Sequence, residues 1–199
     1  TLRSSGPAFC GPLTLAVRHL VQEGTNKMFG LFGKKNTMSG AELAEEGLRQ
    51  VSIAIKGRKI SLQKGKIFND IYLYGDNPNG VPRLTYVAFD PAESGEVIAR
   101  CVILLDRQQH GIPIWQIDWA VLRSHQGRGY GKDITSKALS EFTNGMKGKF
   151  QSGLAIEAIV DDDNVASKKI ASSLLGGEEV LFNKETGRNV HSFLKTFRA

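Results

Sequence analysis

A glycine-rich segment, Val121–Lys132, is the part of the sequence whose residue types and spacing best suit chemistry. Its three glycines alternate along the chain: Gly127, Gly129 and Gly131. They follow a predicted strand and open a predicted helix, so backbone N–H groups would point into one concavity at the helix N-terminus, where an anion binds well. Arg128 and Lys132 add positive charge beside it. The segment therefore predicts a site for phosphate groups, ideally a pyrophosphate.

Two common phosphate-binding motifs do not fit this segment. A Walker A loop needs a serine or threonine after Gly-Lys to bind magnesium, but Gly131-Lys132 is followed by Asp133. A dinucleotide-binding loop needs the spacing G-x-G-x-x-G within a βαβ unit, whereas these glycines simply alternate and the preceding strands form hairpins. The pattern that does match is [Gln/Arg]-x-x-Gly-x-[Gly/Ala], which runs from Gln126 to Gly131.

The other chemistry-bearing residues give no second motif. No group of His, Cys, Asp and Glu has the spacing of a metal site, and no serine lies in a nucleophile elbow. Cys101 alternates within an apolar strand, which is typical of a core residue. His125 either contacts a phosphate or lies in a solvated turn, and we expect the turn; we also expect His110 and His191 at the surface. The sequence therefore predicts neither a metal centre nor a covalent nucleophile.

The elements that must position the glycine loop begin with a helix. Ser39 and Glu42 fit a capping box, and apolar residues follow at helical spacing as far as Ile55, so we expect a helix over 40–56. A basic segment, Arg58–Lys66, comes next. From about residue 70 the pattern changes to short apolar strands separated by turn residues.

The remaining pattern predicts a sheet flanked by helices. The expected strands cover 71–74, 84–89, 97–105, 114–122, 154–160, 180–182 and 190–197, and the expected helices cover 129–146 and 165–175. Turn residues between neighbouring strands favour hairpins. The predicted fold class is α/β (α+β), with a mixed, mostly antiparallel sheet of six to seven strands flanked by helices.

With this loop between its fourth expected strand and the following helix, the chain resembles the GNAT N-acetyltransferase superfamily. In that family a fifth strand follows and ends near an asparagine that begins the next helix; here 154–160 and Asn164 fit. A final hairpin closes the sheet of the family, as the last two expected strands would. The resemblance extends over about residues 70–199, and its motifs cover 119–132 and 164–177.

The resemblance implies a binding site for acetyl-CoA. The fourth and fifth strands would separate, and the pantetheine arm would pair with the exposed strand edge, as in β-augmentation. The pyrophosphate would lie on the loop amides. The residues implied in binding are Trp119, Ala120, Val121, Gln126, Gly127, Arg128, Gly129, Tyr130, Gly131, Lys132, Asn164 and Ser167. The chemistry of the family requires no metal.

The resemblance also implies direct transfer of the acetyl group to an amine. The backbone N–H of Val121 would stabilise the developing oxyanion, and a carboxylate near the strand separation would take the amine proton. Asp118 and Glu157 are the candidate bases; the alternatives are a hydrogen-bonded strand carboxylate for Asp118 and a solvated residue for Glu157. Where the family often has a tyrosine as general acid for the leaving thiolate, this chain has Ala171.

Ala171 keeps a second function open, that of a non-catalytic acyl-CoA sensor or regulator. A third is a nucleic-acid-associated protein, because residues 1–66 hold 11 Lys and Arg against 4 Asp and Glu, whereas 67–199 hold 15 and 16. The basic segment lacks the interleaved aromatics that stack on single strands. We therefore expect acetyl-CoA and an amine acceptor as partners ahead of nucleic acid.

Length and composition bound the class of protein. The 199 residues are 41% hydrophobic and 23% charged, which suits one domain with a full core and excludes wholesale disorder, collagen and coiled coil. We expect 39–199 to form this domain and 1–38, with a short helix at Leu13–Val21, to be a flexible or weakly helical extension. Two cysteines favour a reducing, cytoplasmic location, and no apolar stretch approaches a membrane span. A monomer or a homodimer fits equally well.

Overall fold

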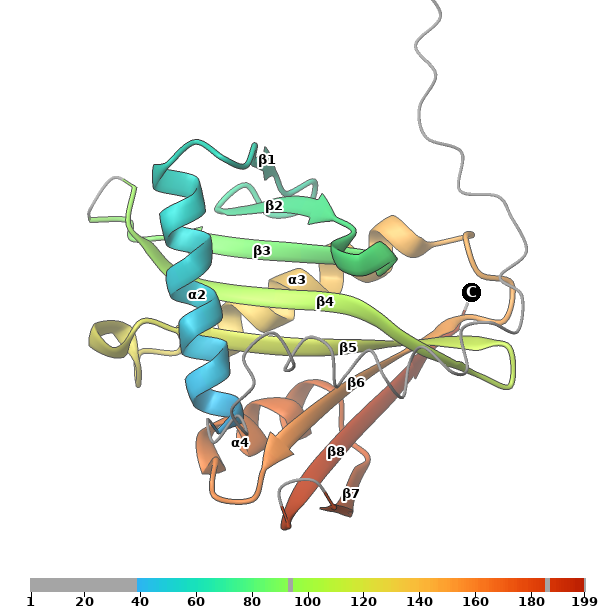
Figure 1. Ribbon diagram of the computed structural model, residues 1–199. Coiled ribbons are helices and arrows are strands. Elements are labelled where there is room, and N and C mark those ends of the chain that lie inside the picture. Colours follow the sequence, from blue (N-terminus) through green and yellow to red (C-terminus); the bar gives the residue numbers. More distant parts are fainter. Residues whose placement is uncertain (1–38, 93–94, 185–186, 199) are drawn as a thin grey trace, which may run out of the picture. The chain divides into compact units, whose positions relative to one another are not determined.

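One mixed sheet of eight strands organises the part of the chain that the computed structural model describes, which is residues 39–92, 95–184 and 187–198 (Figure 1). The strands are β1 (Gln63–Lys64), β2 (Ile71–Asp76), β3 (Arg83–Phe89), β4 (Val97–Gln109), β5 (Ile112–Val121), β6 (Leu154–Asp161), β7 (Glu178–Asn183) and β8 (Arg188–Phe197). Their spatial order is β1-β2-β3-β4-β5-β6-β8-β7. Every neighbouring pair is antiparallel except β5 and β6, which are parallel.

This architecture confirms the predicted fold class, with eight strands in place of six to seven. The additional strand, β1, pairs two exposed residues of the basic segment with β2, and an apolar pattern cannot reveal such a pairing. Strand β4 also runs four residues past its predicted end, because its pairing with β5 continues through polar residues to Gln109. A bulge between Leu105 and Arg107 interrupts the register on the way.

Helix α2 (Gly40–Lys56) lies across one face of the sheet (Figure 1). Both halves of the predicted capping box are present: the Ser39 hydroxyl accepts from the Glu42 N–H, and the Glu42 carboxylate accepts from the Ser39 N–H. Leu48 and Val51 are buried from the helix side, in a cluster that includes Ala120 of β5. Capping and an apolar stripe therefore fix this helix over the sheet, as predicted.

Helices α3 (Tyr130–Met146) and α4 (Val165–Leu174) cover the opposite face and enclose the main core (Figure 1). Trp115 of β5 and Phe142 of α3 pack edge to face, with ring centroids 4.9 Å apart. Cys101 is fully buried in this core, which confirms the structural role predicted for it; burial raises the pKa of its thiol. The glycine loop thus lies between β5 and α3, and α4 follows β6.

The remaining elements are two short 3-10 turns, η1 (Pro78–Gly80) and η2 (Arg123–His125). The expected extension 1–38 and its helix at Leu13–Val21 lie outside the described residues. Among the helices that are described, none has the length and apolar character needed to cross a membrane.

Candidate functional site

The parallel strands β5 and β6 are paired over a short stretch and then part. Register pairs join Ile114–Gln116 to Ala155–Glu157. Beyond them β5 continues to Val121 and β6 to Asp161 without pairing to each other, and Figure 1 shows the two strands diverging toward the end where β5 enters the glycine loop. The separation predicted between the fourth and fifth strands is therefore present.

The backbone of the last residues of β5 faces this separation at alternate positions. Leu122 N–H donates to Ile98 O at 2.8 Å, so by the alternation of an antiparallel ladder Ala120 also bonds to β4, while Trp119 and Val121 point their N–H and C=O groups to the other side. The Gln126 side chain donates to the Val121 carbonyl at 3.1 Å. The N–H and C=O of Trp119 and the N–H of Val121 thus point toward β6, while the Val121 carbonyl on that side is taken by Gln126 and the backbone groups of Ala120 point to β4.

The glycine loop leaves a run of amides without helical partners. Gly127 and Gly129 have φ of +75° and +88°, and a Cβ on either would meet nothing within 4 Å. The first backbone bond of α3 is donated by Asp133 to Gly129 O. The N–H groups of the three residues before Asp133 therefore have no acceptor within the helix. This is the geometry expected of an anion site at a helix N-terminus.

Gly131 sets how closely α3 and α4 approach. A Cβ built on it would lie 3.1 Å from Cδ1 of Ile170 on α4 and 3.9 Å from Trp119 Cδ1. The third glycine of the motif therefore serves packing, whereas Gly127 and Gly129 serve backbone conformation and open space.

Asn164 and Ser167 lie at the start of α4, on the β6 side of the separation. Asn164 is the N-cap, and its Oδ1 accepts from Ser167 N–H at 3.0 Å. Its amide nitrogen keeps its donors for another partner. The capping bond explains why the chain has an asparagine here; contact of this side chain with the pantetheine arm stays a prediction.

Helix α2 ties the ends of both separated strands on the opposite face. The Gly40 N–H donates to Asp161 Oδ2 at 2.8 Å, just at the end of β6. Arg123, two residues after the end of β5, pairs with Glu45 at 2.8 Å. The N-terminal half of α2 therefore bridges the two strand ends, and any acceptor reaching the separation from this face must pass beside it.

Asp118 points to the α2 face and is ion-paired. Arg100 Nη2 donates to its two carboxylate oxygens at 3.0 and 2.9 Å, and also to Ala44 O at 3.3 Å. The Arg100 side chain is 9% exposed and that of Asp118 is 45% exposed. Gly47 makes room for the guanidinium, because a Cβ there would lie 2.5 Å from Arg100 Nη1. The sequence analysis missed Arg100, although a lone arginine in an apolar strand and a glycine inside a helix were its signals.

Glu157 is only 5% exposed, so the alternative interpretation of it as a solvated residue was wrong. Its carboxylate accepts from Arg107 Nη1 at 2.7 Å and from Ser192 Oγ at 2.8 Å. Arg107 also contacts Asp106, and the bond to Glu157 raises the pKa of its guanidinium. Since Glu157 is the last β6 residue in register with β5, this network fixes the point where the strands part.

The acidic turn Asp161–Asp163 does not cap α4. Asp161 binds α2, as described, and Asn164 takes the capping role. Asp162 accepts from His191 Nε2 at 2.6 Å, and Glu178 lies 2.5 Å from the other ring nitrogen. His191 is 8% exposed, so the expected surface position for it was wrong: two carboxylates from other elements enclose it.

We expect His191 to make stability depend on pH. Hydrogen bonds that the imidazolium donates to Asp162 and then to Glu178 raise the pKa of His191 above 6.5, against the opposing effects of desolvation and of Lys168. A raised pKa gives stability that is complete below the unfolded pKa and is lost as pH rises through the folded pKa. Urea unfolding from about pH 6 to 9 should therefore show the free energy of unfolding of the wild type falling relative to that of His191→Gln. Parallel curves would contradict this.

His125 is also not a solvated residue, since its side chain is 11% exposed and its Nε2 lies 3.0 Å from Asp90 Oδ2. His110, in contrast, is exposed in the β4–β5 turn, as predicted. The position of Ala171 is 1% exposed in the main core. The four tyrosines of the chain lie elsewhere: Tyr72, Tyr74, Tyr86 and Tyr130. No tyrosine therefore stands at this position on α4 to protonate a thiolate.

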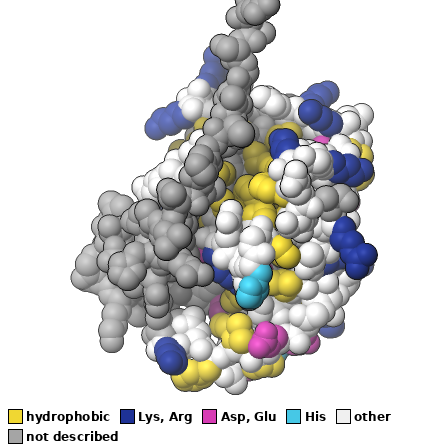
Figure 2. Space-filling model, turned by 90° about the vertical axis from the view of Figure 1, so that its right-hand side faces the viewer, with side chains coloured by type: hydrophobic (Ala, Val, Ile, Leu, Met, Phe, Trp, Pro, Cys, Tyr) yellow, Lys and Arg dark blue, Asp and Glu magenta, His cyan; other side chains and the backbone are white. Residues whose placement is uncertain are grey.

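Basic side chains do not form one strong patch on the face seen in Figure 2. There the Lys and Arg side chains of described residues are spread around the rim, and hydrophobic side chains form a band through the middle. Arg58, Lys59, Lys64 and Lys66 are exposed. This distribution is that of a solvated surface.

A scan against protein-family models and a search of curated proteins each found no match. Solved structures that are similar include a GNAT-family acetyltransferase from Bordetella pertussis (21% identity, 56% of this chain and 63% of that chain, TM-score 0.42). A second is a GCN5-related N-acetyltransferase from Kribbella flavida (21% identity, 58% of this chain and 68% of that chain, TM-score 0.43). A third is a spermidine N-acetyltransferase from Vibrio cholerae (14% identity, 76% of this chain and 90% of that chain, TM-score 0.43). The chain spans less than two thirds of the Bordetella protein, and the substrates of these proteins are not transferred to it.

Proposed function

We propose that this chain is an acetyl-CoA-dependent N-acetyltransferase that moves the acetyl group directly to a primary amine. The observation that carries the proposal is the parting of β5 and β6 directly beside the glycine loop that opens α3. A strand edge with free backbone groups and a cluster of free amides then lie on one continuous segment, Trp119–Lys132. That is what an extended amide-containing arm ending in a pyrophosphate requires.

The loop residues fit the pyrophosphate. Gly127 and Gly129 leave open space where a side chain would project, and the amides of Tyr130, Gly131 and Lys132 have no helical acceptor. The side chains of Arg128 and Lys132 are exposed beside them. Hydrogen bonds from amides to a charged oxygen contribute about 1.5–3 kcal/mol each, so a few of them suffice to select this group.

The edge of β5 and the start of α4 would hold the arm. Trp119 offers a backbone donor and acceptor on the open side of β5, and Val121 offers its N–H, while Gln126 binds the Val121 carbonyl and keeps the end of the strand in place. The Asn164 amide nitrogen and Ser167 lie across the separation. Ala120 contributes through packing in the α2-side cluster, where it is 8% exposed.

The reaction needs a proton acceptor and stabilisation of an oxyanion. The amine nitrogen bonds to the acetyl carbon and the carbon–sulfur bond breaks, so one proton leaves the amine and the thiolate leaves or is protonated by water. Both carboxylates are ion-paired, Asp118 with Arg100 and Glu157 with Arg107. Asp118 is the stronger candidate base because its side chain is 45% exposed, whereas Glu157 is buried. The Val121 N–H is the oxyanion donor.

The buried Ala171 favours one alternative, a protein that binds acyl-CoA as a sensor and does not turn it over. At this position there is no acid for the leaving thiolate, and a larger side chain would overpack the core. Nucleic-acid binding has less support, since the basic side chains of described residues on the face in Figure 2 are spread out.

Calorimetric titration with acetyl-CoA followed by a thiol-release assay over a panel of primary amines tests the proposal. We expect one binding site per chain and thiol release with at least one amine. Binding without release for any amine would assign the sensor function instead. Absence of acetyl-CoA binding would exclude both the enzyme and the sensor. A salt-dependent shift of DNA or RNA that is lost when the exposed Arg58, Lys59, Lys64 and Lys66 are replaced by glutamine would then support the nucleic-acid alternative.

A further inference from the structure

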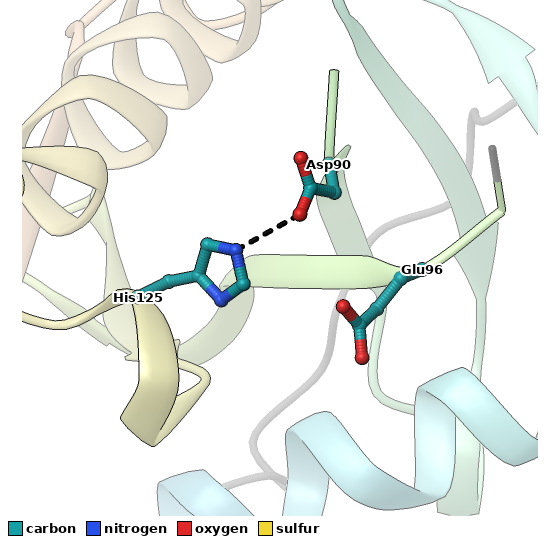
Figure 3. A group of neighbouring side chains, drawn as sticks. All are labelled: Asp90, Glu96 and His125. Atoms are coloured by element: carbon teal, nitrogen blue, oxygen red, sulfur yellow. Dashed lines mark hydrogen bonds and ion pairs between the residues drawn. The ribbon is translucent and has the colours of Figure 1, made fainter. Parts of the chain in front are cut away.

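Three potential metal ligands converge beside the glycine loop, from three separate segments (Figure 3). Asp90 directly follows β3, Glu96 directly precedes β4, and His125 ends η2. One ligand atom from each lies within 4.8 Å of the other two. Residue spacing gave no hint of this group, because six residues separate the first pair and 29 the second along the chain.

We propose that Asp90, Glu96 and His125 form a binding site for a divalent transition-metal ion of the Zn²⁺ class. One imidazole nitrogen and two carboxylates form a donor set that Zn²⁺ accepts, with water or another group in the fourth position. Metal–ligand bonds of about 2.0–2.2 Å place tetrahedral ligands about 3.3–3.6 Å apart. The ligand atoms lie within 4.8 Å of one another, so the side chains need to close by about 1.5 Å at most. Rotation of the Glu96 side chain can supply such a movement.

The surroundings hold two of the ligands in the required state. Ser124 Oγ lies 2.9 Å from His125 Nδ1, where it can accept the Nδ1 proton and leave Nε2 to the metal. The second oxygen of Asp90 accepts from Ala92 N–H at 2.8 Å. Such outer contacts orient metal ligands and fix the imidazole tautomer.

Glu96 is the ligand whose position the fold does not otherwise explain. Its backbone carbonyl accepts from Asp90 N–H at 2.9 Å, which places both carboxylates at the mouth of one turn. Its side chain makes no hydrogen bond or ion pair within the ranges that the structure describes, and in Figure 3 its carboxylate extends to the side on which His125 lies. A cation between these groups would compensate two adjacent carboxylates.

The metal would join the β3–β4 turn to the glycine loop. The His125 ring packs edge to face on Tyr130, the first residue of α3, with centroids 5.9 Å apart. Metal binding would thus restrain the start of α3. If the proposed function holds, this restraint should also raise the affinity for coenzyme A. The metal site itself does not depend on the proposed function.

The test is a calorimetric titration of ZnCl₂ into the full chain after chelator treatment, with Co²⁺ absorption as a second readout of coordination. We expect one ion per chain and a melting temperature that rises with Zn²⁺. Glu96→Gln should weaken binding at least about tenfold and abolish that rise. Glu179→Gln removes the same charge from exposed strand β7 and should bind as the wild type does.

Absence of Zn²⁺ binding by the wild type would overturn the site, and so would equal affinity in the wild type and Glu96→Gln, since the ion would then bind elsewhere. A coenzyme A titration in excess chelator separates the two proposals. If coenzyme A binds in excess chelator and no Zn²⁺ site is found, the proposed function stands and the metal site is wrong. If Zn²⁺ binds and coenzyme A does not, the metal site stands and the proposed function is wrong.

Discussion

Gly129→Val is expected to weaken coenzyme A binding by about a hundredfold or more, because loss of two amide bonds to a pyrophosphate costs about 3 kcal/mol. Gly129 has φ of +88° and faces open space, so a valine there would project into the volume proposed for the phosphates. Its β-branched side chain also disfavours this backbone conformation, at a cost of about 1–2 kcal/mol in stability. Calorimetry and urea unfolding measure the two effects separately.

The matched control is Gly148→Val. Gly148 has φ of +72°, also faces open space, and lies just beyond the other end of α3. Both variants carry the same backbone strain, so we expect similar losses of stability. Coenzyme A affinity should fall in Gly129→Val alone. An equal loss in both variants would attribute the effect to strain in α3 and would contradict the loop assignment.

Asp118→Asn is expected to destabilise the fold by about 2–3 kcal/mol, since it leaves the Arg100 guanidinium buried without a counter-charge. This value lies below that of a fully buried pair, because the Asp118 side chain is 45% exposed and solvent screens part of the charge. Arg100 Nε already has no hydrogen-bond partner among the described residues, so nothing nearby compensates. Asp76→Asn, in the partly exposed pair with Arg83, should cost about 0–1 kcal/mol.

The same residue is the proposed base, and a double variant separates the two roles. Replacing Arg100 with methionine in Asp118→Asn removes the unpaired charge and should recover most of the lost stability. If Asp118 accepts the amine proton, acetyl transfer stays low in this double variant, most of all below neutral pH, where few amines are deprotonated. Recovery of the rate together with stability would make Asp118 a partner of Arg100 and nothing more.

The glycine loop and the helix at 40–56 could be predicted because their determinants are local. A capping box, a helical repeat of apolar residues and alternating glycines each specify a conformation within a few residues. The same is true of Cys101, whose place in an alternating apolar strand predicted its burial. The order of strands and helices, and with it the position of the loop between β5 and α3, followed from such signals.

Tertiary structure alone decided which side chains meet. Strand register placed Arg100 beside Asp118 and Arg107 beside Glu157, and the close of the β3–β4 turn brought Asp90 and Glu96 to His125. Such contacts join residues far apart in the chain, and no periodicity encodes them. The sequence therefore determined the conformation of the glycine loop, for which anion binding stays a prediction. The register of the sheet determined which charged groups are buried in pairs, because burying a charge is favourable only where a partner arrives from another strand.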